Sequence, residues 1–184
     1  MSLTNAPTLE TERLVLRGPA PTDFEPLIAF LTDQTRAAGF GGYDTRHDAW
    51  RWVALSVGHW HIHGYGYFTI EDKATGQPAG ITGIWNPDGW PEPELGWVVF
   101  DGYEGRGIAY EAAARAREWA YEALGFTTLT SNIVPGNTRS VALAERLGAW
   151  FEREYTNVTM GRDMLFRHPG PDALGSDGSV EAYA

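Results

Sequence analysis

The stretch that decides the fold is Asp101-Gly102-Tyr103-Glu104-Gly105-Arg106-Gly107-Ile108-Ala109-Tyr110-Glu111. Glycines on both sides of its arginine let the backbone turn without Cβ clashes, so successive N–H groups can point at one anion. The preceding apolar run, Leu95 to Phe100, is too short for a helix and is rich in β-branched and aromatic residues. The order strand, glycine-rich turn and helix predicts a phosphate-binding turn at the start of a helix.

Two other phosphate-binding motifs are also glycine-rich, and the spacing argues against both. A dinucleotide fingerprint, G-x-G-x-x-G, needs a third glycine, but Tyr110 stands at that position after Gly105 and Gly107. A P-loop needs a lysine followed by serine or threonine, whereas Gly107 is followed by Ile108. A dinucleotide-dependent oxidoreductase and a P-loop enzyme are therefore disfavoured.

The composition indicates a single acidic domain. The chain has 184 residues and a formal net charge of −10, so its overall field repels nucleic acid and anionic membranes. It has no cysteine, which excludes disulfides, thiolate metal sites and cysteine nucleophiles. The sequence shows neither an apolar run of membrane-span length nor a secretory signal. We therefore expect a cytoplasmic protein that binds no nucleic acid and no membrane, and that holds any phosphate locally.

Periodicity and turn residues predict the order of the secondary-structure elements. We expect a flexible arm at residues 1–8, one domain at residues 9–167, and a disordered tail at residues 168–184, which contain few apolar side chains. The predicted strands are 9–17, 66–71, 79–85, 95–100, 126–133, 149–158 and 163–167, and the predicted helices are 22–33, 46–60, 108–124 and 137–147. The helix at 108–124 has the clearest apolar face and ends at Gly125.

Three histidines, His59, His61 and His63, raise the question of a metal site. His59 and His63 have helical spacing and would share a helix face. However, no glutamate lies between them as in a zinc-protease helix, and Gly64 and Gly66 end the helix at this point. We therefore predict no metal site.

Four motifs occur in an order that resembles a known family. They are Thr11-Glu12-Arg13-Leu14 with Leu16-Arg17, Glu94-Leu95-Gly96-Trp97, Gly105 through Ala112, and Asn137-Thr138-Arg139-Ser140 with Glu145-Arg146-Leu147-Gly148. Together they resemble the GNAT superfamily of acyl-CoA-dependent N-acyltransferases, in the branch related to ribosomal-protein N-terminal acetyltransferases. The resemblance implies an α/β (α+β) fold, with a mixed, mostly antiparallel central sheet of about seven strands, splayed fourth and fifth strands, and about four flanking helices.

The resemblance also implies acetyl-CoA as the cosubstrate, because the family's Q/R-x-x-G-x-G/A turn binds the coenzyme A pyrophosphate. The residues that would form this anion cradle are Gly105, Arg106, Gly107, Ile108 and Ala109. Arg106 would supply local positive charge that the acidic chain otherwise lacks. Glu104 departs from the signature, which has Gln or Arg there. Since backbone N–H groups would contact the phosphate, we expect Glu104 to tune coenzyme affinity and not to abolish it.

Three further coenzyme-binding positions are implied by the same resemblance. Val98 and Val99 would bond the pantetheine amides through their main chains, and Asn137 matches the family's position that bonds this arm from the next helix. A plain helix N-cap is the alternative role for Asn137, and the two roles are compatible.

Glu94 and Ser140 are the candidate catalytic residues. Acyl transfer needs a neutral amine, and a lysine-type amine is neutral in fewer than about one molecule in a thousand at pH 7. Glu94, at the start of the central strand, is the candidate base; a solvated strand-end carboxylate is the alternative. Many family members protonate the leaving thiolate with a tyrosine at the position of Ala144. Ser140 is then the candidate to hydrogen-bond the sulfur, or else a helix-capping residue.

The predicted reaction is acetyl transfer from acetyl-CoA to a primary amine, by direct attack in a ternary complex. The acceptor is a small amine or a peptide N-terminus, and the acidic net charge favours a cationic one. The aromatic residues expected to wall its cleft are Phe40, Tyr43, Trp60, Trp85 and Trp90. The assembly is expected to be a monomer or a homodimer. A non-catalytic acyl-CoA-binding module on the same fold is the alternative, suggested by Ala144 and Glu104.

Overall fold

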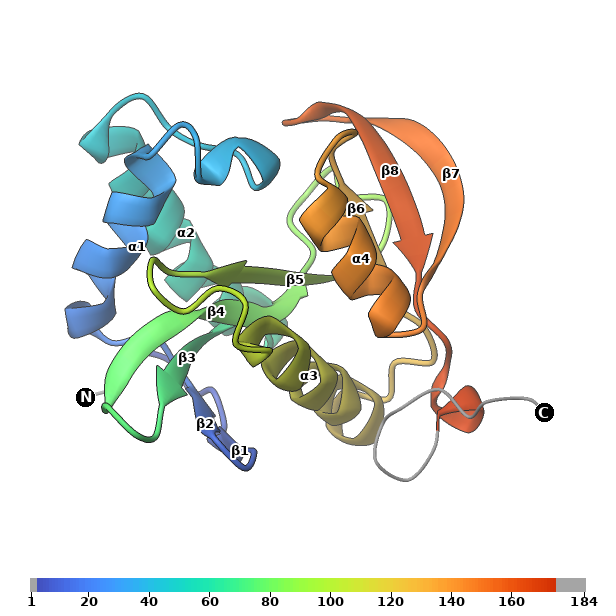
Figure 1. Ribbon diagram of the computed structural model, residues 1–184, viewed down its shortest axis with the longest axis horizontal. Helices are drawn as coiled ribbons and strands as arrows, with labels where there is room; N and C mark the ends of the chain where they lie inside the picture. The colour runs from blue at the N-terminus through green and yellow to red at the C-terminus, as the bar shows by residue number, and fades with distance from the viewer. Residues whose placement is uncertain (1–2, 175–184) are drawn as a thin grey trace.

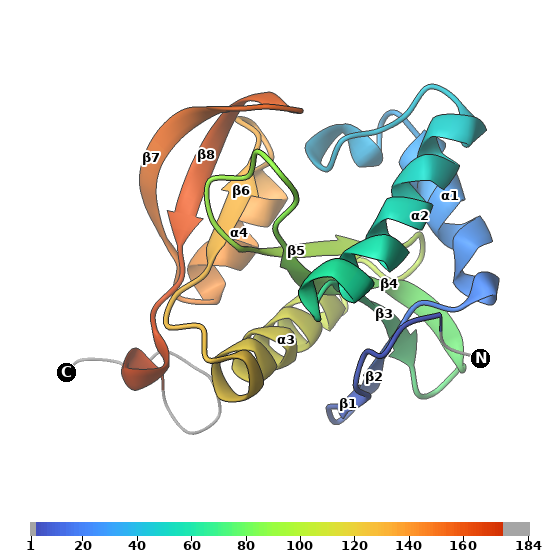
Figure 2. The ribbon, with the colours of Figure 1, turned by 180° about the vertical axis from the view of Figure 1, so that it is seen from behind.

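The computed structural model describes residues 3–174, which form one sheet with helices on both faces (Figures 1 and 2). Within these residues the sheet has eight strands in the order β1-β2-β3-β4-β5-β6-β8-β7. The strands are β1 (Leu9–Glu10), β2 (Leu14–Arg17), β3 (Tyr67–Asp72), β4 (Gln77–Trp85), β5 (Glu94–Val99), β6 (Thr130–Ile133), β7 (Trp150–Asn157) and β8 (Gly161–Arg167). The α-helices are α1 (Phe24–Thr32), α2 (Arg46–His63), α3 (Ile108–Leu124) and α4 (Thr138–Arg146). The predicted mixed, mostly antiparallel α/β fold is confirmed.

The extra strand arises because the predicted strand at residues 9–17 is two strands. Thr11 and Leu14 close a turn between β1 and β2, since the backbone N–H of Thr11 donates to the carbonyl oxygen of Leu14 at 3.0 Å. Leu9 then faces Leu16 across an antiparallel pair. The apolar alternation was correctly seen, but it continues across a hairpin whose turn has no glycine or proline to reveal it.

Successive side chains along each strand point to opposite faces of the sheet, and each face has its own hydrophobic core. Phe68 and Ile70 of β3 are fully buried beneath α3, which covers one face of the sheet. Tyr67 of β3 and Ile81 of β4 point to the opposite face, where they pack with residues of α1 and α2 (Figure 2). This period-2 division holds the sheet between two helical layers and fixes the position of β5 at its centre.

The sheet parts in the middle. β5 pairs with β4 along its whole length, from Glu94 opposite Trp85 to Val99 opposite Gly80, whereas its parallel pairing with β6 is a single register, Glu94 with Thr130. Beyond that point β5 and β6 diverge, and α4 lies on the β6 side of the gap (Figure 1). The predicted splay of the two central strands is therefore confirmed.

α3 begins and ends where the sequence predicts. Gly107 precedes its first residue with φ of 76°, and Gly125 follows its last with φ of 72°. Both conformations are left-handed, a region that costs a residue with a Cβ roughly 1–2 kcal/mol. The glycines at its two ends therefore allow the start and the end of α3 to be predicted from the sequence alone.

The structure describes the first part of the predicted tail, residues 168–174. His168 is buried and its Nε2 lies 2.9 Å from the Ser131 hydroxyl, while the Tyr121 hydroxyl donates to the carbonyl oxygen of Pro169 at 2.7 Å. A short 3-10 helix, η3 (Pro171–Ala173), follows. His168 and Pro169 thus have partners on β6 and α3, and residues 175–184 lie outside the described part.

At the other end of the chain, the described part of the expected arm contacts the domain. The backbone N–H of Leu3 donates to the carbonyl oxygen of Pro19 at 3.0 Å. The carbonyl oxygen of Leu3 lies 3.0 Å from Nε2 of His61. Within residues 3–174, none of the helices combines the length and hydropathy that a bilayer span requires.

Candidate active site

The glycine-rich turn opens into a long groove between the diverging strands. Gly102, Gly105 and Gly107 all have positive φ angles, of 81°, 72° and 76°, so the turn coils directly into the N-terminus of α3. The groove is lined on one side by the end of β5 and the turn, and on the other by α4; its lining includes Val98, Val99, Gly105, Gly107, Ile108, Ala109, Asn137 and Ser140. Seven of the eight predicted coenzyme-binding residues thus lie on one continuous surface, which has room for an extended ligand whose anion rests on the helix N-terminus.

The turn is fixed from behind by Glu111. One carboxylate oxygen accepts the Thr11 hydroxyl at 2.5 Å and the Arg13 backbone N–H at 3.0 Å, and the other accepts Arg13 Nε at 2.7 Å. Arg13 in turn donates to the carbonyl oxygen of Arg106 at 2.8 Å. These contacts, which we call the Arg13–Glu111 clamp, explain why the motif at the β1–β2 turn accompanies the glycine-rich turn. The clamp holds the turn in one backbone conformation.

Arg106 is the predicted residue that the groove does not include. Its guanidinium lies 3.4 Å from Asp72 and 5.2 Å from the centre of the Tyr103 ring, so it points toward the β3–β4 turn. The Arg106 side chain, which we expected to supply positive charge to the cradle, is therefore directed away from it in this structure. The Asp72 carboxylate, remote in sequence, and the ring of Tyr103, three residues before Arg106, attract the guanidinium away from the groove.

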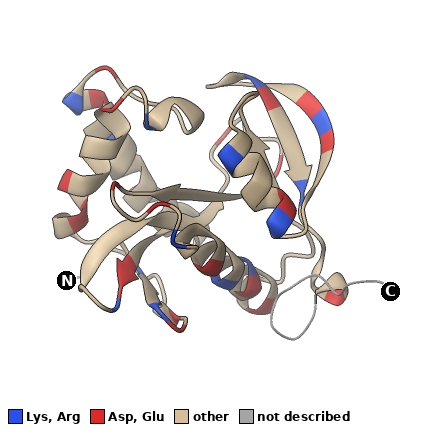
Figure 3. Cartoon of the chain, viewed as in Figure 1, with Lys and Arg blue, Asp and Glu red and all other residues tan. Residues whose placement is uncertain are grey.

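The cations along the groove are instead Arg36, Arg139 and Arg146, which sequence reasoning missed. Arg139 and Arg146 stand on α4, where Figure 3 shows blue segments on a helix that borders the gap. Arg36 comes from the segment after α1 and forms ion pairs with Glu104 and with Asp101, the latter at 2.5 Å. The negative charge of Glu104, the residue that departs from the family signature, is thereby paired with the Arg36 guanidinium.

Asn137 and Ser140 lie where this groove meets a second cavity. The side-chain oxygen of Asn137 accepts the Ser140 backbone N–H at 3.2 Å, so Asn137 is the N-cap of α4. Its amide nitrogen faces Gly39, where a Cβ would lie 2.2 Å away, which explains the need for glycine at that position. Both Asn137 and Ser140 line both cavities. A ligand atom beside Asn137 and Ser140 would therefore be accessible both from the groove and from the second cavity.

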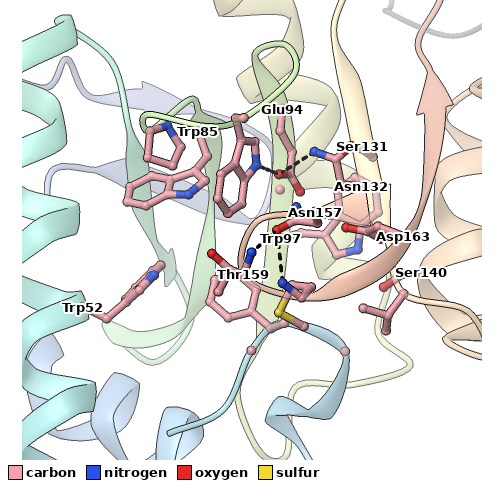
Figure 4. A pocket seen from close by; sticks show the side chains of 18 of the residues that line it. Trp52, Trp85, Glu94, Trp97, Ser131, Asn132, Ser140, Asn157, Thr159 and Asp163 are labelled. Atoms are coloured by element: carbon pink, nitrogen blue, oxygen red, sulfur yellow. Dashed lines mark hydrogen bonds between the residues drawn. The ribbon is translucent and has the colours of Figure 1, made fainter. Parts of the chain in front are cut away.

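The second cavity, of about 400 Å³, holds Glu94. Glu94 Oε2 accepts Trp90 Nε1 at 2.5 Å and Asn132 Nδ2 at 3.0 Å (Figure 4). Burial raises the pKa of the Glu94 carboxyl to about 7, against the two hydrogen bonds, and the carboxylate of Asp163 adds to the rise. A carboxyl with this pKa exchanges a proton near neutrality, as a general base must.

A further polar group on β7 and β8 was not predicted. Asp163 lines the same cavity and is buried, and burial raises the pKa of its carboxyl to about 6. The Tyr155 hydroxyl faces it at 3.5 Å across the β7–β8 register and accepts Asn157 Nδ2 at 3.0 Å. The only sequence signal was a lone Asp at the start of a predicted strand, so its place beside Glu94 depends on the sheet order.

The aromatic wall of the cavity is partly as predicted. Phe40, Tyr43, Trp85 and Trp90 line it, as do Trp52, Tyr67 and Trp97, which the sequence did not single out. Trp60 does not line it: this side chain is fully buried beneath α3, and its Nε1 donates to the carbonyl oxygen of Tyr67 at 2.9 Å.

The histidine cluster is a packing feature in the structure. The His59 and His63 rings lie 4.4 Å apart, and His59 stacks on Trp85 at 4.4 Å. His59 Nε2 accepts the Asn86 backbone N–H and Nδ1 lies 2.8 Å from the Tyr65 carbonyl oxygen, so both ring nitrogens are engaged. Residues 3–174 contain no group of three or more His, Cys, Asp or Glu side chains placed to hold a metal ion.

The family model and the solved structures that match this chain both point to acetyltransferases. Residues 13–149 match the acetyltransferase (GNAT) domain. An acetyltransferase structure from Agrobacterium tumefaciens str. C58 is 38% identical with a TM-score of 0.82, over 89% of this chain and 95% of that one. Protein YkkB of Bacillus subtilis (strain 168), which is uncharacterised, is 27% identical over 81% of this chain and 89% of its own.

A more distant likeness is to a ribosomal-protein-S5-alanine acetyltransferase from Vibrio fischeri, 19% identical with a TM-score of 0.70, over 91% of this chain and 98% of that one. At that identity the likeness concerns the fold. The family match spans the clamp, the glycine-rich turn and α4, the elements that build the groove. The chain belongs to the GNAT acetyltransferase family.

Proposed function

We propose that this protein transfers the acetyl group of acetyl-CoA to the nitrogen of a primary amine by direct attack in a ternary complex. The observation that carries the proposal is the junction of the two cavities, where Ser140 lines both and Glu94 stands on the far side of the second. A coenzyme arm in the groove and an amine in the cavity would therefore meet without a covalent enzyme intermediate.

The groove residues fit coenzyme A. The N-terminus of α3, with its preceding glycines, offers backbone N–H groups and a positive dipole end to a pyrophosphate. Arg139 and Arg146 add charge on the opposite wall. Because β5 has no partner strand on the β6 side beyond Glu94, the main chain of Val99 faces the gap. Arg36 donates to the Val99 carbonyl oxygen at 3.2 Å, so the Val99 N–H is the group offered to an amide of a pantetheine arm.

Two protons must move in this reaction. The amine nitrogen bonds to the acetyl carbonyl carbon and the carbon–sulfur bond breaks; the nitrogen loses a proton and the departing sulfur gains one. Glu94 is placed to receive the amine proton, directly or through a water molecule, because burial raises its pKa to about 7. Ser140 is placed to hydrogen-bond the sulfur. Ala144, at the position where many relatives have tyrosine, is fully buried against Ile133 and Phe166 and faces away from the groove.

The test is release of free thiol from acetyl-CoA in the presence of a panel of primary amines. Glu94→Gln keeps the side-chain size and can still accept from Trp90, and Ser140→Ala keeps the backbone N–H that Asn137 caps. Each substitution should lower kcat by roughly 10²-fold or more with little change in coenzyme affinity. Unchanged kcat in both variants would reject these roles.

A non-catalytic acyl-CoA-binding module remains the second candidate, favoured by the buried Ala144 in place of a tyrosine. It predicts tight coenzyme binding, visible as a rise in Tm with acetyl-CoA, and no thiol release with any amine. Thiol release that depends on both an amine and Glu94 would exclude it.

A further inference from the structure

Three loops border the acceptor cavity, and two of them contact the third, the β7–β8 turn. A Cβ built on Gly41, whose φ is 108°, would lie 2.9 Å from Met160 Sδ, so the loop before α2 meets the β7–β8 turn. Similarly, a Cβ on Gly89 would lie 3.1 Å from a methyl carbon of Val158, so the β4–β5 loop meets the same turn. An extended peptide would have to separate these contacts to lay its main chain across the cavity. These loop contacts therefore favour a small acceptor.

One wall of the cavity is a continuous aromatic surface. Trp52 lies 5.3 Å from Phe40, 5.8 Å from Tyr67 and 5.6 Å from Trp85, measured between ring centroids. Tyr67 and Trp85 are themselves 5.3 Å apart. These four side chains come from α2, β3, β4 and the loop before α2, so the wall is assembled by the fold. It can hold a flat apolar group.

The opposite wall is acidic and polar. Figure 4 shows Trp52 and Trp85 on one side and Asn132, Asp163 and Ser140 on the other, with Glu94 and Trp97 between them. Asn132 donates to Glu94, and its side-chain oxygen is a buried acceptor with no hydrogen-bond partner among residues 3–174. A buried acceptor of this kind is costly unless a donor satisfies it. The carboxyl groups of Glu94 and Asp163, which both line the cavity, are the acceptors for an ammonium group on this wall.

We propose that the acceptor is a small amphipathic amine, with a primary ammonium group directed at Glu94 and Asp163 and an aromatic or similarly flat apolar body against the wall built around Trp52. This inference rests on the proposed function and names its substrate class. A peptide laid across the cavity would have to separate the loop contacts at Gly41 and Gly89, and a polyamine has no flat apolar group for the aromatic wall. An arylalkylamine satisfies both walls at once.

The experiment compares kcat/KM for four acceptors: 2-phenylethylamine, butylamine, 1,4-diaminobutane and a hexapeptide with an N-terminal serine. We expect 2-phenylethylamine to exceed each of the others by at least about tenfold, the range that a well-packed apolar group contributes to discrimination. Trp52→Leu should raise the KM for 2-phenylethylamine by a larger factor than the KM for butylamine, so that the ratio of the two kcat/KM values falls to within a few-fold of one. Trp150→Leu is the matched control, because Trp150 is 52% exposed on β7 and does not line the cavity.

A second arm does not depend on turnover. Titration of the wild-type protein with 2-phenylethylamine should change its tryptophan fluorescence, and Asp163→Asn should weaken this binding several-fold. Preference for the peptide or the diamine would overturn the inference while thiol release leaves the proposed function standing. Binding of 2-phenylethylamine without thiol release from any amine would overturn the proposed function and keep the pocket assignment. Neither binding nor turnover with this amine would overturn the inference.

Discussion

Asn132 on β6 donates a 3.0 Å hydrogen bond to Glu94 on β5, at the one level where these two strands are paired. The bond joins the two halves of the sheet just before they part. It also orients the carboxyl group that we propose as the base, because the Asn132 amide holds one oxygen and leaves the other for a substrate. The proposed base therefore lies at the point where β5 and β6 begin to diverge.

The pH dependence of the reaction should report Glu94. Since burial raises its pKa to about 7, kcat/KM should rise about tenfold per pH unit below 7 and level off above it, for an acceptor whose own ionisation is corrected for. Glu94→Gln should abolish this inflection. Persistence of the same inflection in the variant would assign it to another group, such as Asp163, whose raised pKa is about 6.

Glu94 should also cost the protein stability at neutral pH and above. The folded protein keeps the proton to about pH 7, whereas the unfolded chain releases it near the ordinary value of 4.5, so stability falls as pH rises between those values. Glu94→Gln should therefore stabilise the protein at pH 8, by at most about 3 kcal/mol, and much less at pH 4. Denaturant unfolding at both pH values checks this, with the exposed Glu122→Gln as the charge-matched control. Equal effects of Glu94→Gln at the two pH values would contradict the prediction.

Gly107 and Gly125 form a matched pair for testing the cradle. Both have left-handed φ angles at the ends of α3, so Gly107→Val and Gly125→Val should each destabilise the fold by roughly 1–2 kcal/mol. Only Gly107 lines the groove. Gly107→Val should therefore raise the KM for acetyl-CoA by at least about tenfold, whereas Gly125→Val should not, and steady-state kinetics at a temperature where both variants are folded separates the two effects.

The Arg13–Glu111 clamp should contribute to coenzyme affinity without touching the coenzyme. Arg13→Met removes the donors to Glu111 and to the Arg106 carbonyl oxygen and loosens the turn. We expect the KM for acetyl-CoA to rise several-fold while kcat changes little. Arg46→Met, which breaks an exposed ion pair with Glu25 away from the groove, is the control and should leave both constants unchanged.

Arg36 should compensate for Glu104. Arg36→Met leaves the carboxylates of Glu104 and Asp101 unpaired beside the groove, so the affinity for an anionic coenzyme should fall several-fold at low salt. Adding Glu104→Gln, which restores a residue of the family signature, should recover most of the loss. A double variant no better than Arg36→Met alone would show that Arg36 acts on the coenzyme by another route.

Local signals made part of the fold and site predictable. Gly107 and Gly125 fix both ends of α3, and the short apolar run before the turn places β5, so the strand–turn–helix unit and Glu94 follow from neighbouring residues. The cradle backbone was predictable for the same reason. The outer strands β7 and β8 were also predicted, at residues 149–158 and 163–167, although β7 is exposed along most of its length.

Other features depend on residues far apart in sequence. Arg106 turns toward Asp72, and Asp163 reaches Glu94's cavity only because β8 inserts between β6 and β7. His168 is buried through contacts with Ser131, although the segment that follows it has the composition of a tail. Composition and periodicity carry no information on such pairings, so the direction of a charged side chain was the least predictable property of this chain.

The parting of β5 and β6 creates an open strand edge in the interior of a sheet. An edge at the periphery is a hazard, because any extended chain can pair with it and begin aggregation. Here the exposed backbone groups stand at the bottom of a slot bordered by α3 and α4 and crossed by Arg36, whose guanidinium donates to the carbonyl oxygen of Val99 at 3.2 Å. An extended ligand of amides and methylenes along this edge would occupy the backbone groups that a neighbouring β-strand would otherwise pair with. Binding of such a ligand would therefore also cap an edge at which another chain could pair.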